Sequence, residues 1–124
     1  MNIFYNILII TTSLFNLIAH TCPQAFRHLR YLLIGDEALN PHFLRRVLHS
    51  SPSQHLINCY GSTESTIMSL NHEITLDELT EESVPIGKPI ANTDIYILDE
   101  NQQTVEPNKI GERYIGGEGL ARGY

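Results

Sequence analysis

The sequence predicts an α/β fold in which parallel βαβαβ units lead into a β-rich segment. Three short apolar runs begin about 24 residues apart and are separated by helical patterns: Ile7–Ile10, Tyr31–Ile34 and Leu56–Tyr60. Because these runs are continuously apolar, they are typical of strands buried on both faces of a parallel sheet. From residue 85 onward, short apolar runs alternate with turn residues, which favours antiparallel strands. We therefore divide the chain into residues 1–84 and 85–124.

The first 26 residues carry no charged side chain. A secretory signal or a membrane span is one interpretation, but no Lys or Arg precedes the apolar core and polar residues interrupt it. We favour a buried strand at Ile7–Ile10 that turns into a helix at Leu14–His20, followed by a second helical segment at Gln24–Leu29. On this interpretation the protein is cytoplasmic and has no membrane partner.

A helix is predicted between the second and third strands. Asn40 is a good N-cap, and Pro41 stands at the first helical position, where its missing N–H costs nothing. The apolar residues that follow share one helical face: Phe43, Leu44, Val47 and Leu48. The sequence therefore contains the crossover helix that a parallel βαβ unit requires.

The chain after the third strand is expected to change character. Thr66–Leu70 is predicted to be a further strand, and His72–Ser83 an acidic loop on the solvated surface. Pro85–Pro89 is rich in turn residues and marks a boundary. Thr93–Leu98 and Gly111–Gly116 are then predicted to be strands.

Composition excludes several classes of function. Eight Lys and Arg stand against 14 Asp and Glu, a net charge of −6, and no basic stripe suits nucleic acid. The two cysteines, Cys22 and Cys59, give neither a disulfide framework nor a CxxC metal site. The six histidines include no HExxH or HxH pattern, so we expect no metal cluster built on histidine.

Small, hydroxylated or acidic residues follow each of the three predicted parallel strands, at 11–13, 35–37 and 61–64. The carboxyl ends of parallel strands share one edge of the sheet, where ligands bind in such folds. Residues 58–64 (NCYGSTE) combine an amide, an aromatic ring, two hydroxyls and a carboxylate, which suits a nucleotide with a divalent cation. The alternative is a surface turn in which Ser62 and Thr63 bond the local backbone.

A second cluster, residues 116–119 (GGEG), is rich in glycine. It lacks the GxxxxGK[ST] pattern and no predicted helix follows it, so a tight structural turn is favoured over a phosphate loop.

These clusters, in this order, resemble motifs of the adenylation domains of nonribosomal peptide synthetases, in the superfamily of adenylate-forming, AMP-binding enzymes. Residues 58–64 resemble N-x-Y-G-P-T-E, and residues 111–124 (GERYIGGEGLARGY) resemble G-E-L-x-I-x-G-x-G-L-A-R-G-Y. Residues 32–39 (LLIGDEAL) are similar to L-L-x-G-G-E-A-L, and residues 11–16 also fit. The resemblance runs from about residue 7 to the end of the sequence.

The resemblance implies a fold and a reaction. The chain would be part of the large N-terminal subdomain, with an adenine and magnesium half-site in residues 1–84 and the start of a β-barrel in residues 85–124. The family joins an amino acid to ATP, giving an aminoacyl-adenylate and pyrophosphate, and then transfers the aminoacyl group to the phosphopantetheine thiol of a carrier protein. The implied partners are ATP, Mg²⁺, an amino acid, the rest of the adenylation domain and a carrier domain.

The resemblance also implies roles for individual residues. Tyr60 would stack on adenine and Asn58 would meet its amino edge. Thr63 would contact the α-phosphate and Glu64 would hold Mg²⁺; these two form the catalytic set. The nucleotide-binding set comprises Gly35, Asp36, Glu37, Asn58, Tyr60, Gly61, Ser62 and Thr63. The substrate side-chain pocket comprises Leu33, Gly35, Cys59, Ile67 and Met68, with Ile10 as a further candidate, and its apolar character suggests a neutral side chain.

The sequence departs from the family motifs at three positions. Ser62 replaces Pro and Asp36 replaces Gly, and both residue types suit turns. Arg113 replaces Leu at a strand position. If that position faces a core, we expect the arginine to extend its charged head to solvent.

Other family elements lie outside the matched motifs. No Ser/Thr/Gly-rich phosphate loop with its lysine precedes residue 7, and neither the ribose-binding aspartate nor the C-terminal catalytic lysine follows Tyr124. We therefore expect an internal fragment that is inactive alone in amino-acid-dependent ATP–pyrophosphate exchange. The alternatives are a non-catalytic remnant or nucleotide-binding module, and a fragment of an acyl-CoA ligase-like enzyme, which the L-A-R-G-Y ending and Asn58 disfavour.

Overall fold

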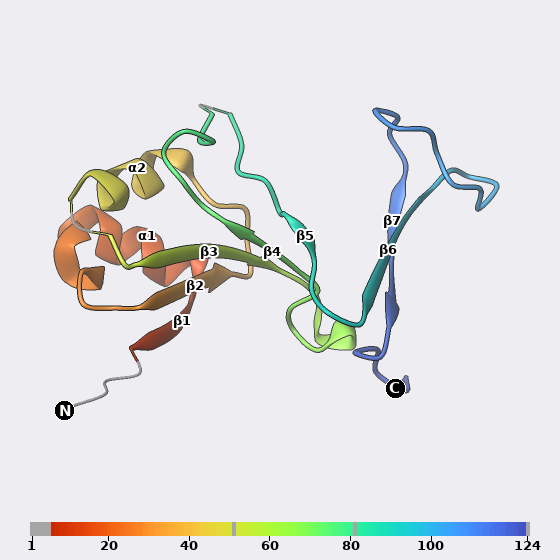
Figure 1. Ribbon diagram of the computed structural model, residues 1–124, viewed down its shortest axis with the longest axis horizontal. Helices are drawn as coiled ribbons and strands as arrows, with labels where there is room; N and C mark the ends of the chain where they lie inside the picture. Colours follow the sequence, from red (N-terminus) through yellow and green to blue (C-terminus); the bar gives the residue numbers. More distant parts are fainter. Residues whose placement is uncertain (1–5, 51, 81, 124) are drawn as a thin grey trace.

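A computed structural model describes residues 6–50, 52–80 and 82–123. Five strands form one sheet in the order β1-β2-β3-β4-β5, and β6 pairs with β7 in a second sheet (Figure 1). The β1–β2 and β2–β3 pairs are parallel, and the other pairs are antiparallel. The elements in chain order are β1 (Ile7–Thr11), α1 (Thr12–Thr21), the 3₁₀ turn η1 (Pro23–Phe26), β2 (Tyr31–Gly35), α2 (Pro41–Ser50), β3 (His55–Tyr60), the 3₁₀ turn η2 (Thr63–Ser65), β4 (Leu70–Glu73), β5 (Lys88–Pro89), β6 (Thr93–Leu98) and β7 (Glu112–Gly117).

The parallel βαβαβ arrangement is confirmed, with its three predicted strands at their expected places. Helix α1 begins where the Thr11 hydroxyl accepts a hydrogen bond from the Leu14 N–H, and α2 begins after Asn40, whose side-chain oxygen accepts from the His42 N–H at 2.9 Å. The helix expected at Gln24–Leu29 is only the short 3₁₀ turn η1. The described residues contain no helix with the length and apolarity needed to cross a bilayer.

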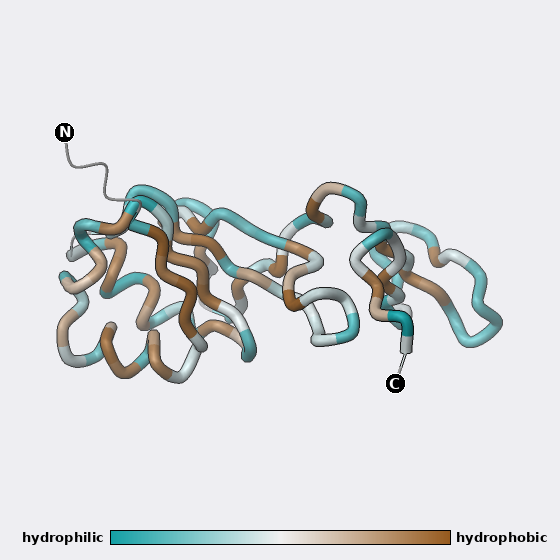
Figure 2. The backbone as a smooth tube through the Cα atoms, turned by 90° about the horizontal axis from the view of Figure 1, so that it is seen from below, coloured by the Kyte–Doolittle hydropathy of each residue, from teal (hydrophilic) through white to brown (hydrophobic). Residues whose placement is uncertain are grey.

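Both helices cover the same face of the five-stranded sheet, and the core lies between these layers (Figure 2). Strand side chains alternate, so that Leu32 and Ile34 of β2 point into this core. Helix α1 contributes Phe15 and α2 contributes Leu44 and Val47. These five side chains are all fully buried.

The opposite face of the sheet corrects the expectation that the strands are buried on both sides. Ile7 and Ile9 of β1 are 55% and 63% exposed, because no described helix covers the face to which they point. Ile9 stands in register with Leu33, and Leu33 with Ile57, so an apolar row crosses this face. The apolar runs therefore predicted the strands correctly but not their burial.

The strand predicted at Thr66–Leu70 is wrong. Thr66 and Ile67 have φ angles of 59° and 71°, the left-handed region, which no strand residue adopts. The chain reverses there and begins β4 only at Leu70, so that β4 pairs antiparallel with β3. Strand β4 also takes up the first residues of the expected acidic loop, and residues 74–80 and 82–83 lie outside the helices and strands.

The second sheet agrees closely with the strands predicted from the sequence, since β6 spans Thr93–Leu98 and β7 spans Glu112–Gly117. It lies beside the turn that follows β3 (Figure 1), where the Ala121 N–H donates to the Glu64 carbonyl at 2.7 Å. The intervening β5 pairs with β4 and so belongs to the first sheet. The division at residue 84/85 stays a prediction.

Candidate functional site

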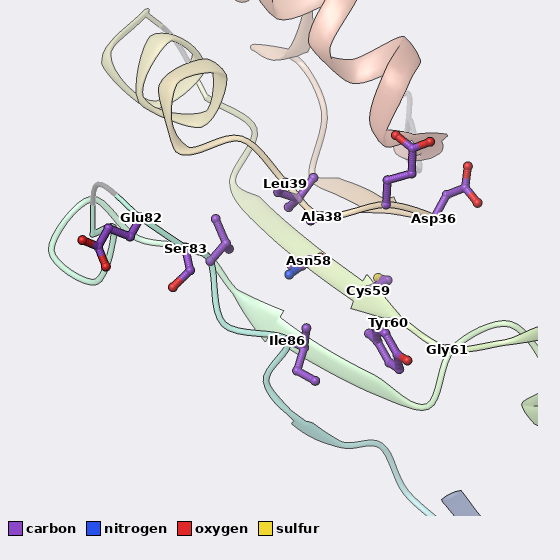
Figure 3. Close-up of a pocket in the computed structure, with 12 residues that line it drawn as sticks. Asp36, Ala38, Leu39, Asn58, Cys59, Tyr60, Gly61, Glu82, Ser83 and Ile86 are labelled. Atoms are coloured by element: carbon purple, nitrogen blue, oxygen red, sulfur yellow. The ribbon is translucent and has the colours of Figure 1, made fainter. Parts of the chain in front are cut away.

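Two adjoining cavities lie at the carboxyl edge of the parallel strands. The first has a volume of about 270 Å³ and lies among three segments: the turn after β2, the end of β3, and the loop before β5 (Figure 3). Its lining residues are Asp36, Glu37, Ala38, Leu39, Asn58, Cys59, Tyr60, Gly61, Glu82, Ser83, Val84 and Ile86. The structure thus brings five of the predicted nucleotide-binding residues, from two separate motifs, together in this cavity. The other three, Gly35, Ser62 and Thr63, line the second cavity instead.

Asn58 lies on the floor of the first cavity, and only 6% of its surface is exposed. Its amide nitrogen donates a hydrogen bond to the Pro85 carbonyl at 2.9 Å. This bond fixes the orientation of the amide, and no described residue donates to the amide oxygen through a side-chain hydrogen bond. Asn58 therefore offers an acceptor to a ligand in the cavity. Sequence reasoning missed the loop at 82–86, because only the antiparallel β4–β5 pairing brings it beside β3.

A side chain of helix α1 holds the turn after β2 in place. The Thr12 hydroxyl, almost fully buried, donates to the carbonyls of Gly35 and Glu37 at 3.2 and 3.0 Å. Gly35 is required at its position, because a Cβ there would lie 2.7 Å from the Cys59 carbonyl oxygen. Sequence reasoning named Gly35 and Glu37 as site residues but gave Thr12 no role, although Thr12 lies in the polar turn after β1 and within the motif match of residues 11–16.

Asp36 has a φ of 102°, which explains why the family motif has glycine at this position. Such a φ costs a residue with a Cβ on the order of 1–3 kcal/mol. We predict that Asp36→Gly raises the free energy of unfolding by about 1 kcal/mol, after the entropic cost of glycine is subtracted. Urea denaturation measures this. Asp36→Ala is the matched control, because it keeps the Cβ and should give no gain; equal stabilisation by both substitutions would contradict the prediction.

The hydroxyl-bearing side chains of the turn after β3 differ in what surrounds them. The Ser62 hydroxyl lies 3.2 Å from that of Ser65, and the Ser62 N–H donates to the Ser65 hydroxyl at 3.0 Å, forming a capping box. Ser62 thus bonds the local turn, as the alternative interpretation held. The side chains of Thr63 and Glu64 are exposed.

Tyr60 ends β3 and lines the first cavity with its half-buried ring. The guanidinium carbon of Arg113 on β7 lies over this ring, 4.0 Å from its centroid. The expectation that Arg113 extends to solvent is therefore wrong, because an aromatic face is within its reach. This contact joins the two sheets at the edge of the cavity.

The second cavity has a volume of about 370 Å³ and lies on the open face of the sheet beside the first. It brings together most of the predicted substrate-pocket residues, but Leu33 is not among those that line it. Sequence reasoning missed Ile9, and it placed Thr11 at the ligand-binding edge without assigning it to the pocket, although Thr11 is the register partner of Gly35. The lining residues are Ile9, Ile10, Thr11, Gly35, Asp36, Cys59, Gly61, Ser62, Thr63, Ile67 and Met68.

Cys59 lines both cavities and separates them. Burial raises the pKa of its thiol above the ordinary value, so the sulfur is uncharged at neutral pH. Cys22, in contrast, is exposed on the far side of α1 from this edge, where that helix ends. The residues that line both cavities are Asp36, Cys59 and Gly61, so the shared lining combines the neutral thiol with one carboxylate.

The model of the AMP-binding enzyme family matches residues 5–124. The chain belongs to that family. It is 44% identical over 117 residues to the nonribosomal peptide synthetase asaC of Aspergillus flavus, covering 94% of this chain and 12% of that protein. It also superimposes with a TM-score of 0.90 on PA1221, described as a nonribosomal peptide synthetase protein containing adenylation and carrier (PCP) domains, at 42% identity over 96% of this chain and 24% of the other.

The fold is that of the N-terminal subdomain of these adenylation domains. The N-terminal subdomain of Klebsiella oxytoca NpsA superimposes with a TM-score of 0.85 over 96% of this chain and 31% of that chain, at 22% identity, a likeness of fold alone. The chain thus corresponds to a minor part of the length of each of these relatives. The predicted membership in nonribosomal peptide synthetase adenylation domains is confirmed.

Proposed function

We propose that this chain forms the adenine- and magnesium-binding half-site of an amino-acid-activating adenylation domain. The reaction joins ATP and an amino acid into an aminoacyl-adenylate, releases pyrophosphate, and passes the aminoacyl group to the phosphopantetheine thiol of a carrier domain. The observation that carries the proposal is the first cavity, in which Asn58, Tyr60 and residues 36–37 surround one space at the carboxyl edge of the sheet.

The first cavity suits an adenine ring. The Asn58 amide oxygen is a hydrogen-bond acceptor whose orientation the Pro85 carbonyl fixes, and the exocyclic amine of adenine is a donor. The Tyr60 ring offers a flat apolar face for stacking. Asp36 and Glu37 line the rim beside it, on the side where the adenosine would continue.

The turn after β3 suits the phosphates. Thr63 presents an exposed hydroxyl donor for the α-phosphate, and Glu64 presents an exposed carboxylate. Mg²⁺ is commonly held by one or two carboxylates together with substrate phosphate oxygens, so a single glutamate fits this ion. When bound, the ion would neutralise phosphate charge. Thr63 and Glu64 would also position the nucleotide. Positioning and electrostatic stabilisation together supply most of the catalysis in phosphoryl-centred reactions.

The second cavity suits the side chain of the amino acid. Ile10, Ile67 and Met68 give it an apolar lining, and the neutral Cys59 thiol adds no charge. The Asp36 carboxylate also lines this cavity, but it borders the first cavity as well and is assigned here to the nucleotide. An uncharged, predominantly apolar side chain is therefore the preferred substrate class. Because Cys59 also borders the first cavity, the two ligands would lie on opposite sides of one residue, as the joining of their reacting groups requires.

Titration with AMP, followed by calorimetry and by amide NMR spectra, tests the base site. We predict binding with the largest spectral changes at residues 36–39 and 58–61. Tyr60→Ala should weaken binding by about tenfold, since stacking of a base on an aromatic ring contributes roughly 1–3 kcal/mol. Tyr96→Ala is the matched control, because Tyr96 is a half-exposed tyrosine on β6. No AMP binding, or equal effects of the two substitutions, would overturn the proposed adenine site.

A non-hydrolysable leucyl-adenylate analogue distinguishes amino-acid activation from simple nucleotide binding. In an adenylation site the analogue fills both cavities, so it should bind more tightly than AMP and shift the signals of Ile67 and Met68. A module that binds only nucleotide would bind both ligands equally and leave those two signals in place.

A further inference from the structure

We propose that Arg113 positions the adenine-stacking ring of Tyr60 from behind, so that the second sheet contributes to the nucleotide site. The two residues are far apart in sequence, on β7 and at the end of β3. The guanidinium carbon nevertheless lies 4.0 Å from the ring centroid, well inside the distance of about 6 Å at which a cation is attracted to an aromatic face. This proposal rests on the proposed function, which assigns Tyr60 to the base.

The lining of the cavities indicates which face of the ring Arg113 covers. Tyr60 lines the first cavity, whereas Arg113 lines neither that cavity nor the second. These linings fit a guanidinium group on the face of the ring that is turned away from the cavity, as the proposal requires. The other face would then receive the base, which would place the ring between a fixed cation and the adenine.

The positively charged group of Arg113 has the Tyr60 ring as its neighbour. Within the described ranges no carboxylate forms an ion pair with Arg113, and its register partner on β6 is the apolar Ile97. The adjacent carboxylate of Glu112 instead accepts a hydrogen bond from the Tyr114 hydroxyl at 2.9 Å. The π face of Tyr60 is thus the principal partner of this cation.

Two hydrogen bonds hold the end of β7 in the position that this interaction needs. The Ala121 N–H, just beyond β7, donates to the Glu64 carbonyl at 2.7 Å, and the Thr66 hydroxyl donates to the Gly119 carbonyl at 2.5 Å. Both contacts tie the end of the second sheet to the turn that follows Tyr60. A leucine at position 113, the motif residue, would offer packing but no cation, so the arginine gives this chain an additional constraint on the ring.

A double-mutant cycle on the full chain tests the proposal. Arg113→Met keeps the length of the side chain and removes its charge, and we expect it to weaken AMP binding about threefold to fivefold, the range of a partly exposed cation–π contact. Arg113→Lys should restore most of the affinity. In the Tyr60→Ala background, Arg113→Met should cause no further loss. Arg122→Met, at an exposed arginine beyond β7, should leave the affinity unchanged.

An NMR measurement without nucleotide checks the contact itself. Protons next to the Arg113 guanidinium should be shifted upfield by the Tyr60 ring current, and Tyr60→Ala should abolish that shift while the amide spectra of both sheets show that the chain stays folded. An equal loss of affinity in both backgrounds, no loss in Arg113→Met, or the absence of the upfield shift would overturn the role of Arg113 alone. Failure of the unsubstituted chain to bind AMP would overturn the proposed function together with it.

Discussion

Gly87→Ala is expected to detach β5 from β4 and to destabilise the chain by roughly 3–5 kcal/mol, the sum of backbone strain and overpacking. Gly87 has a φ of 87°, and a Cβ added there would lie 1.7 Å from the Asn71 carbonyl oxygen. The clashing atom belongs to the backbone of the paired strand, so no side-chain rotation relieves the contact. Urea denaturation should show a much lower midpoint.

The same substitution is expected to abolish AMP binding. The loop immediately before Gly87 carries the Pro85 carbonyl, which orients the Asn58 amide, and it also forms one wall of the first cavity. Gly116→Ala is the matched control, because the nearest atom to an added Cβ there is on the Tyr96 ring at 3.4 Å and the backbone is not left-handed. A Gly87→Ala chain with the midpoint of the Gly116→Ala chain would contradict this account.

The parallel strands could be predicted because each feature that determines them is local. Continuous apolar runs indicated β1, β2 and β3, and Asn40 with Pro41 indicated the start of α2. Burial could not be predicted in the same way. The sequence periodicity does not tell which face of β1 is covered, and Ile9 and Leu8 look alike until the positions of the helices are known.

Some residues of the candidate site could likewise be predicted from the sequence, and others could not. Tyr60 and Asn58 were predicted from one motif, because their residue types and spacing carry the resemblance. Pro85 was missed, since it acts through its backbone carbonyl, and any residue type carries one. The contact of Arg113 with Tyr60 depends on the packing of two sheets, so only its departure from the motif marked it in advance.

Phe15→Ala is expected to have an effect as large as that of Gly87→Ala, a loss of about 3–5 kcal/mol in the free energy of unfolding. The ring is fully buried between α1 and the sheet and stacks on Phe26 with a centroid distance of 5.6 Å. Native proteins are stable by only about 5–15 kcal/mol, so this loss would leave much of the chain unfolded. Thermal and urea denaturation followed by circular dichroism measure it.

Leu17→Ala is the matched control in the same helix, because Leu17 is 60% exposed and alanine is a better helix former. Its stability should be unchanged or slightly higher. Phe15 also supports the site, since it packs the helix whose Thr12 hydroxyl holds the carbonyls of Gly35 and Glu37. A substitution of Phe15 should therefore weaken AMP binding at a distance, even under conditions where the chain stays folded. If Phe15→Ala and Leu17→Ala unfolded at the same urea concentration, the helix layer would not be what stabilises this edge of the sheet.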